Sequence, residues 1–217
     1  MLQQISAHYG PLRPSATLPT DRGVREQAPA RVVRKEIIRP VPADRLAVGY
    51  RAPALADADR GAYEVLAAIL AGGPASRLHK RLVVTDEVAS SVSGSVPATK
   101  DPGLYALWVQ MKKGHGATKA EAVVEAEITR MATEPVPGEE LDRAKSQLET
   151  AFWHGLDSSE GRAEQLGAYE VVAGDFRRLL ARAHEYRAVT AADVRRVADG
   201  YLRAAGRSIV VARPKPE

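Results

Sequence analysis

LAVGYRAPALADADRGAYEVLAAILAGGPASRLHKRLV, residues 46–83, is the stretch of the sequence that decides the fold. Its first residues alternate, with Leu46, Val48 and Tyr50 on one side. Alternation with a period of two is typical of a strand that buries one face. The sequence therefore predicts a strand over residues 46–52 with this apolar side turned toward the core.

An apolar helix is predicted directly after this strand. Asp59 is placed to cap its first turn, and the helix is expected to run to about Ala71. Its apolar face is formed by Val65, Leu66, Ile69 and Leu70. Gly72-Gly73-Pro74 stops the helix, and a short second helix is expected over residues 76–82.

The rest of the chain groups its strands and its helices separately. Further strands are predicted over residues 31–38, 89–97, 104–112 and 207–212. Further helices are predicted over residues 118–133, 139–155, 159–173, 176–187 and 190–204. Thr118 with Glu121, and Thr190 with Asp193, fit capping boxes. Grouped elements of this kind favour an α+β fold, a mostly antiparallel sheet of about five to six strands with helices on one face.

The chain divides into a tail and one domain. Residues 1–29 contain four prolines with glycines and polar residues between them, which favours an extended linker without regular structure. We expect this tail to come from a preceding domain and to stay outside the core. Residues 30–217 are expected to form the folded domain.

Composition narrows the classes of function. The sequence has no cysteine, which excludes disulfides and thiolate catalysis but leaves the compartment open between bacterial cytoplasm and periplasm. No apolar run approaches the roughly 20 residues of a membrane span, and Met1–Gly10 lacks the pattern of a signal peptide. The net charge of +4 is spread along predicted helices among acidic residues, so we expect no nucleic-acid partner.

The histidines do not form a zinc signature. The five are His8, His79, His115, His154 and His184. Helical zinc motifs place two imidazoles one turn apart on the same face, and no pair here is that close. We therefore expect no metal or other cofactor bound by this chain, and surface positions for its histidines. Gly72–Ser76 lacks the lysine ending of a phosphate-binding loop, and a helix C-cap explains its glycines.

Several motifs occur together in an order typical of one family. The first group is Leu46–Pro53, Asp57–Asp59, Gly72–Gly73 and Ser76-Arg77-Leu78. The second group is Asp101–Tyr105, Pro137–Lys145 and Val189–Val194, and Ile5–Pro14 is similar to the end of a preceding domain. This ordered set resembles the C-terminal domain of the pitrilysin/insulysin/mitochondrial-processing-peptidase family of zinc peptidases, across nearly the whole chain.

The resemblance implies a role without catalysis. In that family an N-terminal domain carries H-x-x-E-H and the zinc, while the C-terminal domain closes a substrate chamber and normally binds no metal. The implied partners are an N-terminal catalytic domain of the same protein, a homologous partner subunit and a peptide substrate. The implied substrate-facing loop contains Gly72, Gly73, Ser76 and Arg77.

One departure from the family pattern concerns substrate binding. Many members carry an arginine and a tyrosine, spaced R-x6-Y, that hold the substrate backbone. Val83 and Ser90 stand at the matching positions, and neither side chain supplies a guanidinium or a phenol. The loss fits the zinc-bearing subunit of a two-subunit peptidase, and it equally fits an inactive scaffold protein with the same fold.

Overall fold

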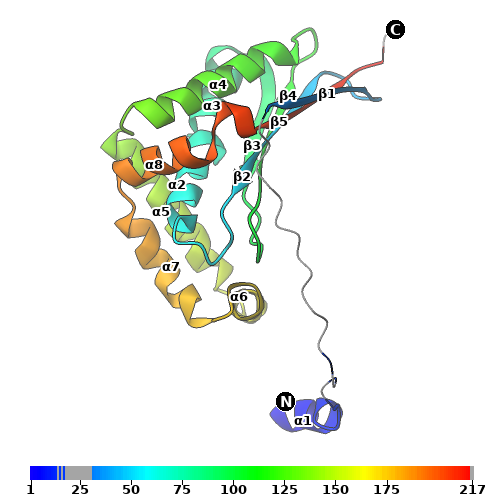
Figure 1. The fold of residues 1–217 in the computed structure, drawn as a ribbon, viewed down its shortest axis with the longest axis vertical. Coiled ribbons are helices and arrows are strands. Elements are labelled where there is room, and N and C mark those ends of the chain that lie inside the picture. Colours follow the sequence, from blue (N-terminus) through cyan, green and yellow to red (C-terminus); the bar gives the residue numbers. More distant parts are fainter. Residues whose placement is uncertain (14, 16, 18–30, 216–217) are drawn as a thin grey trace.

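The computed structural model describes residues 1–13, 15, 17 and 31–215 (Figure 1). Its strands are β1 (Val33–Ile38), β2 (Arg45–Ala52), β3 (Ala89–Ser95), β4 (Gly103–Met111) and β5 (Ser208–Arg213). Its α-helices are α1 (Leu2–Tyr9), α2 (Arg60–Ala71), α3 (Arg77–His79), α4 (Ala117–Thr133), α5 (Gly138–Gly155), α6 (Ser159–Ala173), α7 (Arg177–Ala188) and α8 (Ala191–Tyr201). A π-helical turn, η1 (Lys80–Thr85), and a 3₁₀ turn, η2 (Ala204–Gly206), complete the description.

The five strands form one sheet in the order β1-β5-β2-β4-β3. Three of the four neighbouring pairs are antiparallel, and β1 pairs parallel to β5. The α+β class and the mostly antiparallel sheet are therefore confirmed, with one parallel pair that the sequence did not reveal. The last strand returns across the helical block and inserts between β1 and β2, so the first and last strands of the domain lie side by side.

Helices cover one face of this sheet, as predicted (Figure 1). The covered face presents Leu46, Val48 and Tyr50 from β2, all at most 2% exposed, and the alternate residues of β4 from Tyr105 to Met111. α2 lies at the centre of the helical layer, where every residue except Glu64 is buried. Its alanines and leucines allow close approach of the surrounding α5, α7 and α8, which offsets the scarcity of aromatic residues.

Two predicted helix caps do not form as expected. α4 begins at Ala117 rather than at Thr118, and the Asp44 carboxylate accepts the Ala117 N–H at 3.1 Å, so the predicted box of Thr118 and Glu121 is wrong. Glu121 instead bonds the Arg34 guanidinium on β1. Asp59 stands at the N-cap of α2 but makes no side-chain cap bond. By contrast, Thr190 and Asp193 form the full predicted capping box of α8.

The amino-terminal region differs from its prediction where it is described. Residues 2–9 form α1, although the tail was expected to lack regular structure; Gly10 is the C-cap of the helix, just before the first proline. None of its residues is buried, and it lies apart from the layered body in Figure 1. Residues 14, 16 and 18–30 fall outside the described residues, so the boundary at 29/30 stays a prediction.

Candidate functional site

The loop between α2 and α3 is tightly organised by hydrogen bonds. Gly73 has φ +114°, a left-handed value that favours glycine. Its carbonyl accepts the Ser76 hydroxyl at 2.6 Å and the Ser76 N–H at 3.0 Å. The Gly72 carbonyl accepts the side-chain amide of Gln147 from α5. The loop is therefore fixed to the helical layer at both glycines.

Arg77 ties this loop to two further helices. Its guanidinium donates to both carboxylate oxygens of Glu140, at 2.7 to 3.2 Å, and approaches Glu127 at 3.8 Å. The three side chains are 12 to 16% exposed. Paired carboxylates around one arginine make a strong, directional link between α3, α4 and α5. The substrate-facing role of Gly72, Gly73, Ser76 and Arg77 stays a prediction, and a substrate there would meet an arginine that already has partners.

A cavity of about 370 Å³ opens beside Arg77. Its walls include Lys80 and Arg81 from the turn after α3, Arg130 from α4, Glu134 at the C-cap of α4, and Pro137. Arg81 is paired with Asp86, and Arg130 with Glu127 and Glu134. The cavity is thus lined by charges of both signs that largely satisfy one another.

The two positions matched to the family's arginine and tyrosine occupy irregular backbone. Val83 lies in the π-helical turn and packs partly against the core. Ser90 lies where the register of β3 against β4 shifts between Ala89 and Ser91, and its hydroxyl donates to the Gln110 carbonyl at 3.2 Å. π-turns and bulges are frequent at functional sites. Neither side chain here offers a charged or phenolic donor.

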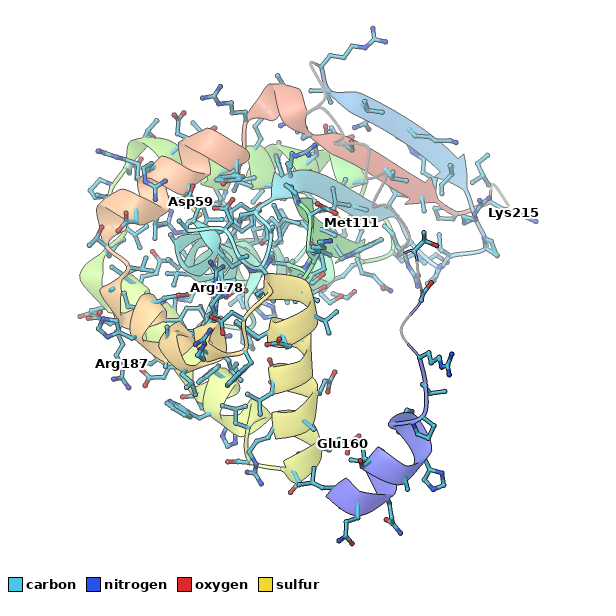
Figure 2. All side chains as sticks on the ribbon, turned by 60° about the horizontal axis from the view of Figure 1, so that its bottom comes forward. Asp59, Met111, Glu160, Arg178, Arg187 and Lys215 are labelled. Carbon is cyan, nitrogen blue, oxygen red and sulfur yellow. The ribbon has the colours of Figure 1, made fainter. Side chains whose placement is uncertain are left out.

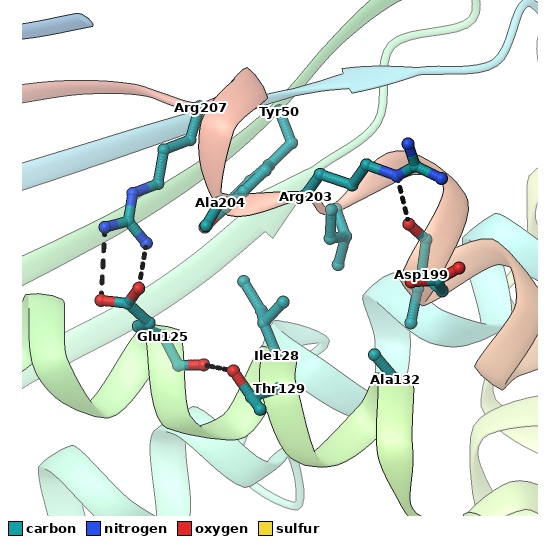
Figure 3. A pocket seen from close by; sticks show the side chains of 11 residues that line it. Tyr50, Glu125, Ile128, Thr129, Ala132, Asp199, Arg203, Ala204 and Arg207 are labelled. Atoms are coloured by element: carbon teal, nitrogen blue, oxygen red, sulfur yellow. Dashed lines mark hydrogen bonds and ion pairs between the residues drawn. The ribbon is translucent and has the colours of Figure 1, made fainter. Parts of the chain in front are cut away.

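A second cavity, of about 290 Å³, lies between α4 and the end of α8 (Figure 3). Its floor is the Tyr50 ring with Ile128 and small residues such as Ala132. Arg207 stands at one end, where its two terminal amines meet Glu125 at 3.1 and 3.2 Å. Burial raises the pKa of the Tyr50 phenol. The arrangement is an ion pair beside an apolar lining, and Thr129 and Asp199 also line the cavity.

No metal centre is formed by the described residues. Within residues 1–13, 15, 17 and 31–215, no three side chains of the His, Cys, Asp or Glu type come together in a group that could hold a metal ion. His154 contacts Asp157 on the exposed end of α5 at 3.2 Å. No group of side chains in this described part of the chain fits the zinc that the family implies. In the part of the chain that the structure describes, no helix is long and apolar enough to cross a membrane.

The open face of the sheet is the surface that the sequence analysis did not single out. Register places the outward residues in rows, one of which crosses all five strands as Lys35, Val210, Ala47, Trp108 and Ser93. Trp108 is 54% exposed and Leu104 53%. A Cβ on Gly49 would meet the Leu104 side chain at 2.9 Å, so Leu104 lies over this glycine.

This face is apolar at its centre, polar along β3 and at the ends of β2, and mixed along β1, where Val33 and Ile37 flank Lys35. We define the open face as the outward residues of β1 to β5, which are Val33, Lys35, Ile37, Arg45, Ala47, Gly49, Arg51, Ser91, Ser93, Ser95, Leu104, Ala106, Trp108, Gln110, Ser208, Val210 and Ala212. Large exposed apolar patches with polar rims mark interaction surfaces. The alternation of Ala106, Trp108 and Gln110 with the buried residues of β4 was the sequence signal that could have located it.

Figure 2 shows the helical layer on one side of the molecule and the ends of β1 and β5 on the other. Asp59 and Arg187 mark the helical side, Lys215 marks the end of the chain beyond β5, and the buried Met111 lies between them in this view. The order and packing of these elements define an α+β domain with one covered and one open sheet face.

Comparison with known protein families narrows the class of protein further. Residues 1–148 match the family model described as the peptidase M16 inactive domain. The chain therefore belongs to the peptidase M16 family, as its C-terminal, inactive domain.

Relatives agree with this assignment. The beta subunit of the mitochondrial-processing peptidase of Lentinula edodes is 29% identical over 133 residues, which is 60% of this chain and 28% of the relative. The inactive peptidase domain of a candidate zinc protease from Bordetella parapertussis matches with a TM-score of 0.73 and 27% identity, over 83% of this chain and 97% of that one.

A third match concerns the fold alone. A protease from Helicobacter pylori matches with a TM-score of 0.90 and 20% identity, over 98% of this chain and 52% of that chain. The chain thus spans about half of that protein's length and less than a third of the curated relative's.

Proposed function

We propose that this chain is the non-catalytic C-terminal half of a zinc metalloendopeptidase subunit. It forms part of the wall of the substrate chamber and the interface with the catalytic domain that precedes it. A homologous partner subunit supplies the substrate-holding arginine and tyrosine that Val83 and Ser90 replace here. The zinc belongs to the catalytic domain, and the substrates are peptides or small unfolded chains.

The observation that carries this proposal is the open face of the sheet. A sheet that is covered on one side normally turns polar residues to water on the other. Here Trp108, Leu104 and Val210 stand exposed around Ala47 and Gly49. An apolar face of this kind is stabilised when another domain covers it, and the family provides such a domain directly before this one.

Tryptophan fluorescence tests the proposal directly. The chain has two tryptophans, Trp108 on the open face and Trp153 on α5, which are 54% and 52% exposed. In the Trp153→Phe variant, adding the polypeptide encoded directly upstream of residue 1 should shift Trp108 emission to shorter wavelength. In the matched Trp108→Phe variant, the same addition should leave Trp153 emission unchanged. No complex in size-exclusion chromatography, together with no shift, would refute the proposed domain interface.

The alternative function is a structural protein of the same fold without proteolytic activity. Val83 and Ser90 are compatible with it, because a chain without substrate-holding donors fits a scaffold as well as a divided enzyme. An H-x-x-E-H motif in the upstream polypeptide, with peptide cleavage that a chelator abolishes, supports the peptidase. The same polypeptide without that motif and without cleavage supports the scaffold.

A further inference from the structure

We infer that the open face of the sheet selects a partner segment that is apolar in its middle and acidic at its ends. The inference rests on the proposed function, because it names the chemistry of the segment that the preceding domain places there. It starts from the distribution of charge on the two sides of the molecule.

The cations of the open face have no acidic counterpart. Its charged residues are Lys35, Arg45 and Arg51, and none of its seventeen outward positions holds aspartate or glutamate. Within residues 1–13, 15, 17 and 31–215, none of these three side chains makes a hydrogen bond or an ion pair. The open face is therefore a positively charged surface around an apolar centre.

The helical side is organised in the opposite way. Arg60 pairs with Glu64, Arg77 with Glu140, and Arg196 with Asp59. Even Arg34, which is on β1 but points to the covered face, bonds Glu121 from α4. Most arginines of the helical side thus have a carboxylate partner within the described chain, with Arg143 and Arg195 among the exceptions. No cation of the open face has one there, which leaves these cations for carboxylates from elsewhere.

The spacing of the cations constrains the partner. Arg45 and Arg51 are the outward residues near the two ends of β2, six residues apart. At about 3.3 Å per residue this separates their Cα atoms by about 20 Å. Ala47 and Gly49 lie between, with Trp108 beside Ala47 and the side chain of Leu104 over Gly49. The partner segment thus carries acidic side chains about 20 Å apart and apolar side chains in the interval.

Charge also disfavours other occupants. A second copy of this chain would bring the same cations against each other across a two-fold interface, and like charges there weaken binding. A nucleic acid would contact closely spaced cations along a phosphate track, whereas here the cations surround an apolar centre. An acidic amphipathic segment satisfies both the charges and the apolar centre.

The test is charge reversal on two sides of the molecule. Arg45→Glu/Arg51→Glu should weaken binding of the upstream polypeptide about tenfold at about 50 mM salt, and much less at about 500 mM salt. The matched control is Arg143→Glu/Arg195→Glu, which makes the same change of charge at exposed, unpaired arginines of α5 and α8 in the described chain. The control should bind as tightly as the parent, and circular dichroism should show that both variants are folded.

Two synthetic peptides separate this inference from the proposed function. Each has an apolar middle, and one carries glutamates and the other lysines at both ends. In the Trp153→Phe chain only the acidic peptide should shift Trp108 emission. If the upstream polypeptide fails to bind while the acidic peptide binds, the proposed function is wrong and the charge preference stands.

The opposite results would overturn the inference. Binding of the upstream polypeptide that neither salt nor Arg45→Glu/Arg51→Glu changes would leave the domain interface and remove the charge preference. A blue shift of Trp108 with chain concentration alone would identify a second copy as the occupant. A shift caused by an oligonucleotide would identify a nucleic acid.

Discussion

The two faces of the five-stranded sheet use the same strands for different purposes. On the covered face, Tyr105 and Leu107 of β4 are fully buried beneath the helices, while Trp108 between Leu107 and Val109 is 54% exposed on the other side. Charges follow the same division, because most arginines of the helical side pair with carboxylates, whereas the described cations of the open face pair with none. One face of the sheet therefore holds the domain together, whereas the other is exposed and is the face that the proposed partner would cover.

The largest expected difference between the sides concerns buried charge. Arg60 is 2% exposed; its guanidinium pairs with Glu64 at 2.6 Å and donates to the carbonyls of Pro53, Val96 and Pro97. Arg60→Met should lower the free energy of unfolding by about 3–5 kcal/mol, because it leaves a largely buried carboxylate and three carbonyls without this donor. Arg45→Met on the open face should change it by less than about 0.5 kcal/mol. Urea denaturation of both variants measures the difference.

Neighbouring residues of β4 provide the next comparison. Leu107→Ala should lower the free energy of unfolding by about 2–5 kcal/mol, because it opens a cavity under the helices. Trp108→Ala should change the unfolding free energy of the isolated chain by no more than about 1 kcal/mol, because half of that side chain is already in water. Equal losses in the two variants would show that the open face is covered within this chain. Thermal and urea unfolding at several chain concentrations would also exclude self-association as the cause.

The helix caps allow a further comparison, between substitutions that remove a cap bond and one that does not. Thr190→Ala removes the cap of α8 and should lower the free energy of unfolding by about 1 kcal/mol. Thr118→Ala should lower the free energy of unfolding by less than about 0.5 kcal/mol. The reason is that α4 begins before Thr118, and the Asp44 carboxylate accepts the N–H of its first residue, Ala117. Asp44→Ala should then cost about 1 kcal/mol. A loss in Thr118→Ala as large as in Thr190→Ala would restore the capping box that the sequence suggested.

These caps illustrate what the sequence could and could not predict. Alternation in residues 46–52 and 104–112 and the periodicity of α2 located the covered face correctly, because burial acts residue by residue along each element. The partners of Ala117 and Arg77 were missed, because Asp44 lies 73 residues from Ala117 and Glu140 lies 63 residues from Arg77. The parallel pairing of β1 with β5 was missed for the same reason, since nothing local fixes which strands become neighbours.

In the candidate site, too, the sequence predicted the local features but not the contacts between distant residues. The glycines of the Gly72–Arg77 loop were recognised as a helix end, and the positive φ of Gly73 agrees with that interpretation. The ion pairs that hold Arg77 depend on three helices meeting, which no local pattern encodes. Ser90 could be placed on a strand, but the bulge beside it depends on how β3 pairs with β4.

The smallest expected effect is the change of the free energy of unfolding with pH in the acid range. The Thr190 hydroxyl and backbone N–H bond the Asp193 carboxylate at 2.6 and 3.0 Å, which lowers the pKa of Asp193 from its ordinary value of 3.8. A lowered folded-state pKa gives stability that is fully present above the ordinary value and is lost as the pH falls through the folded-state pKa.

The Asp193→Asn variant should therefore lose less stability than the parent between pH 5 and pH 2. The effect should be small, because this carboxylate is 38% exposed and solvent screens its interactions. The other aspartate and glutamate side chains with a lowered pKa, Glu149 and Asp175, also lie outside the sheet, in α5 and before α7.

The open face contributes no carboxylate of its own. Acid should accordingly destabilise the isolated chain through its helical side, whereas acid should weaken the proposed complex through the carboxylates of the proposed partner. Urea unfolding of the isolated chain and Trp108 emission of the complex, each followed over the same pH series, separate the two effects. If Arg45→Gln/Arg51→Gln changed the acid sensitivity of the isolated chain as much as Asp193→Asn does, the division of charge between the two sides would be wrong.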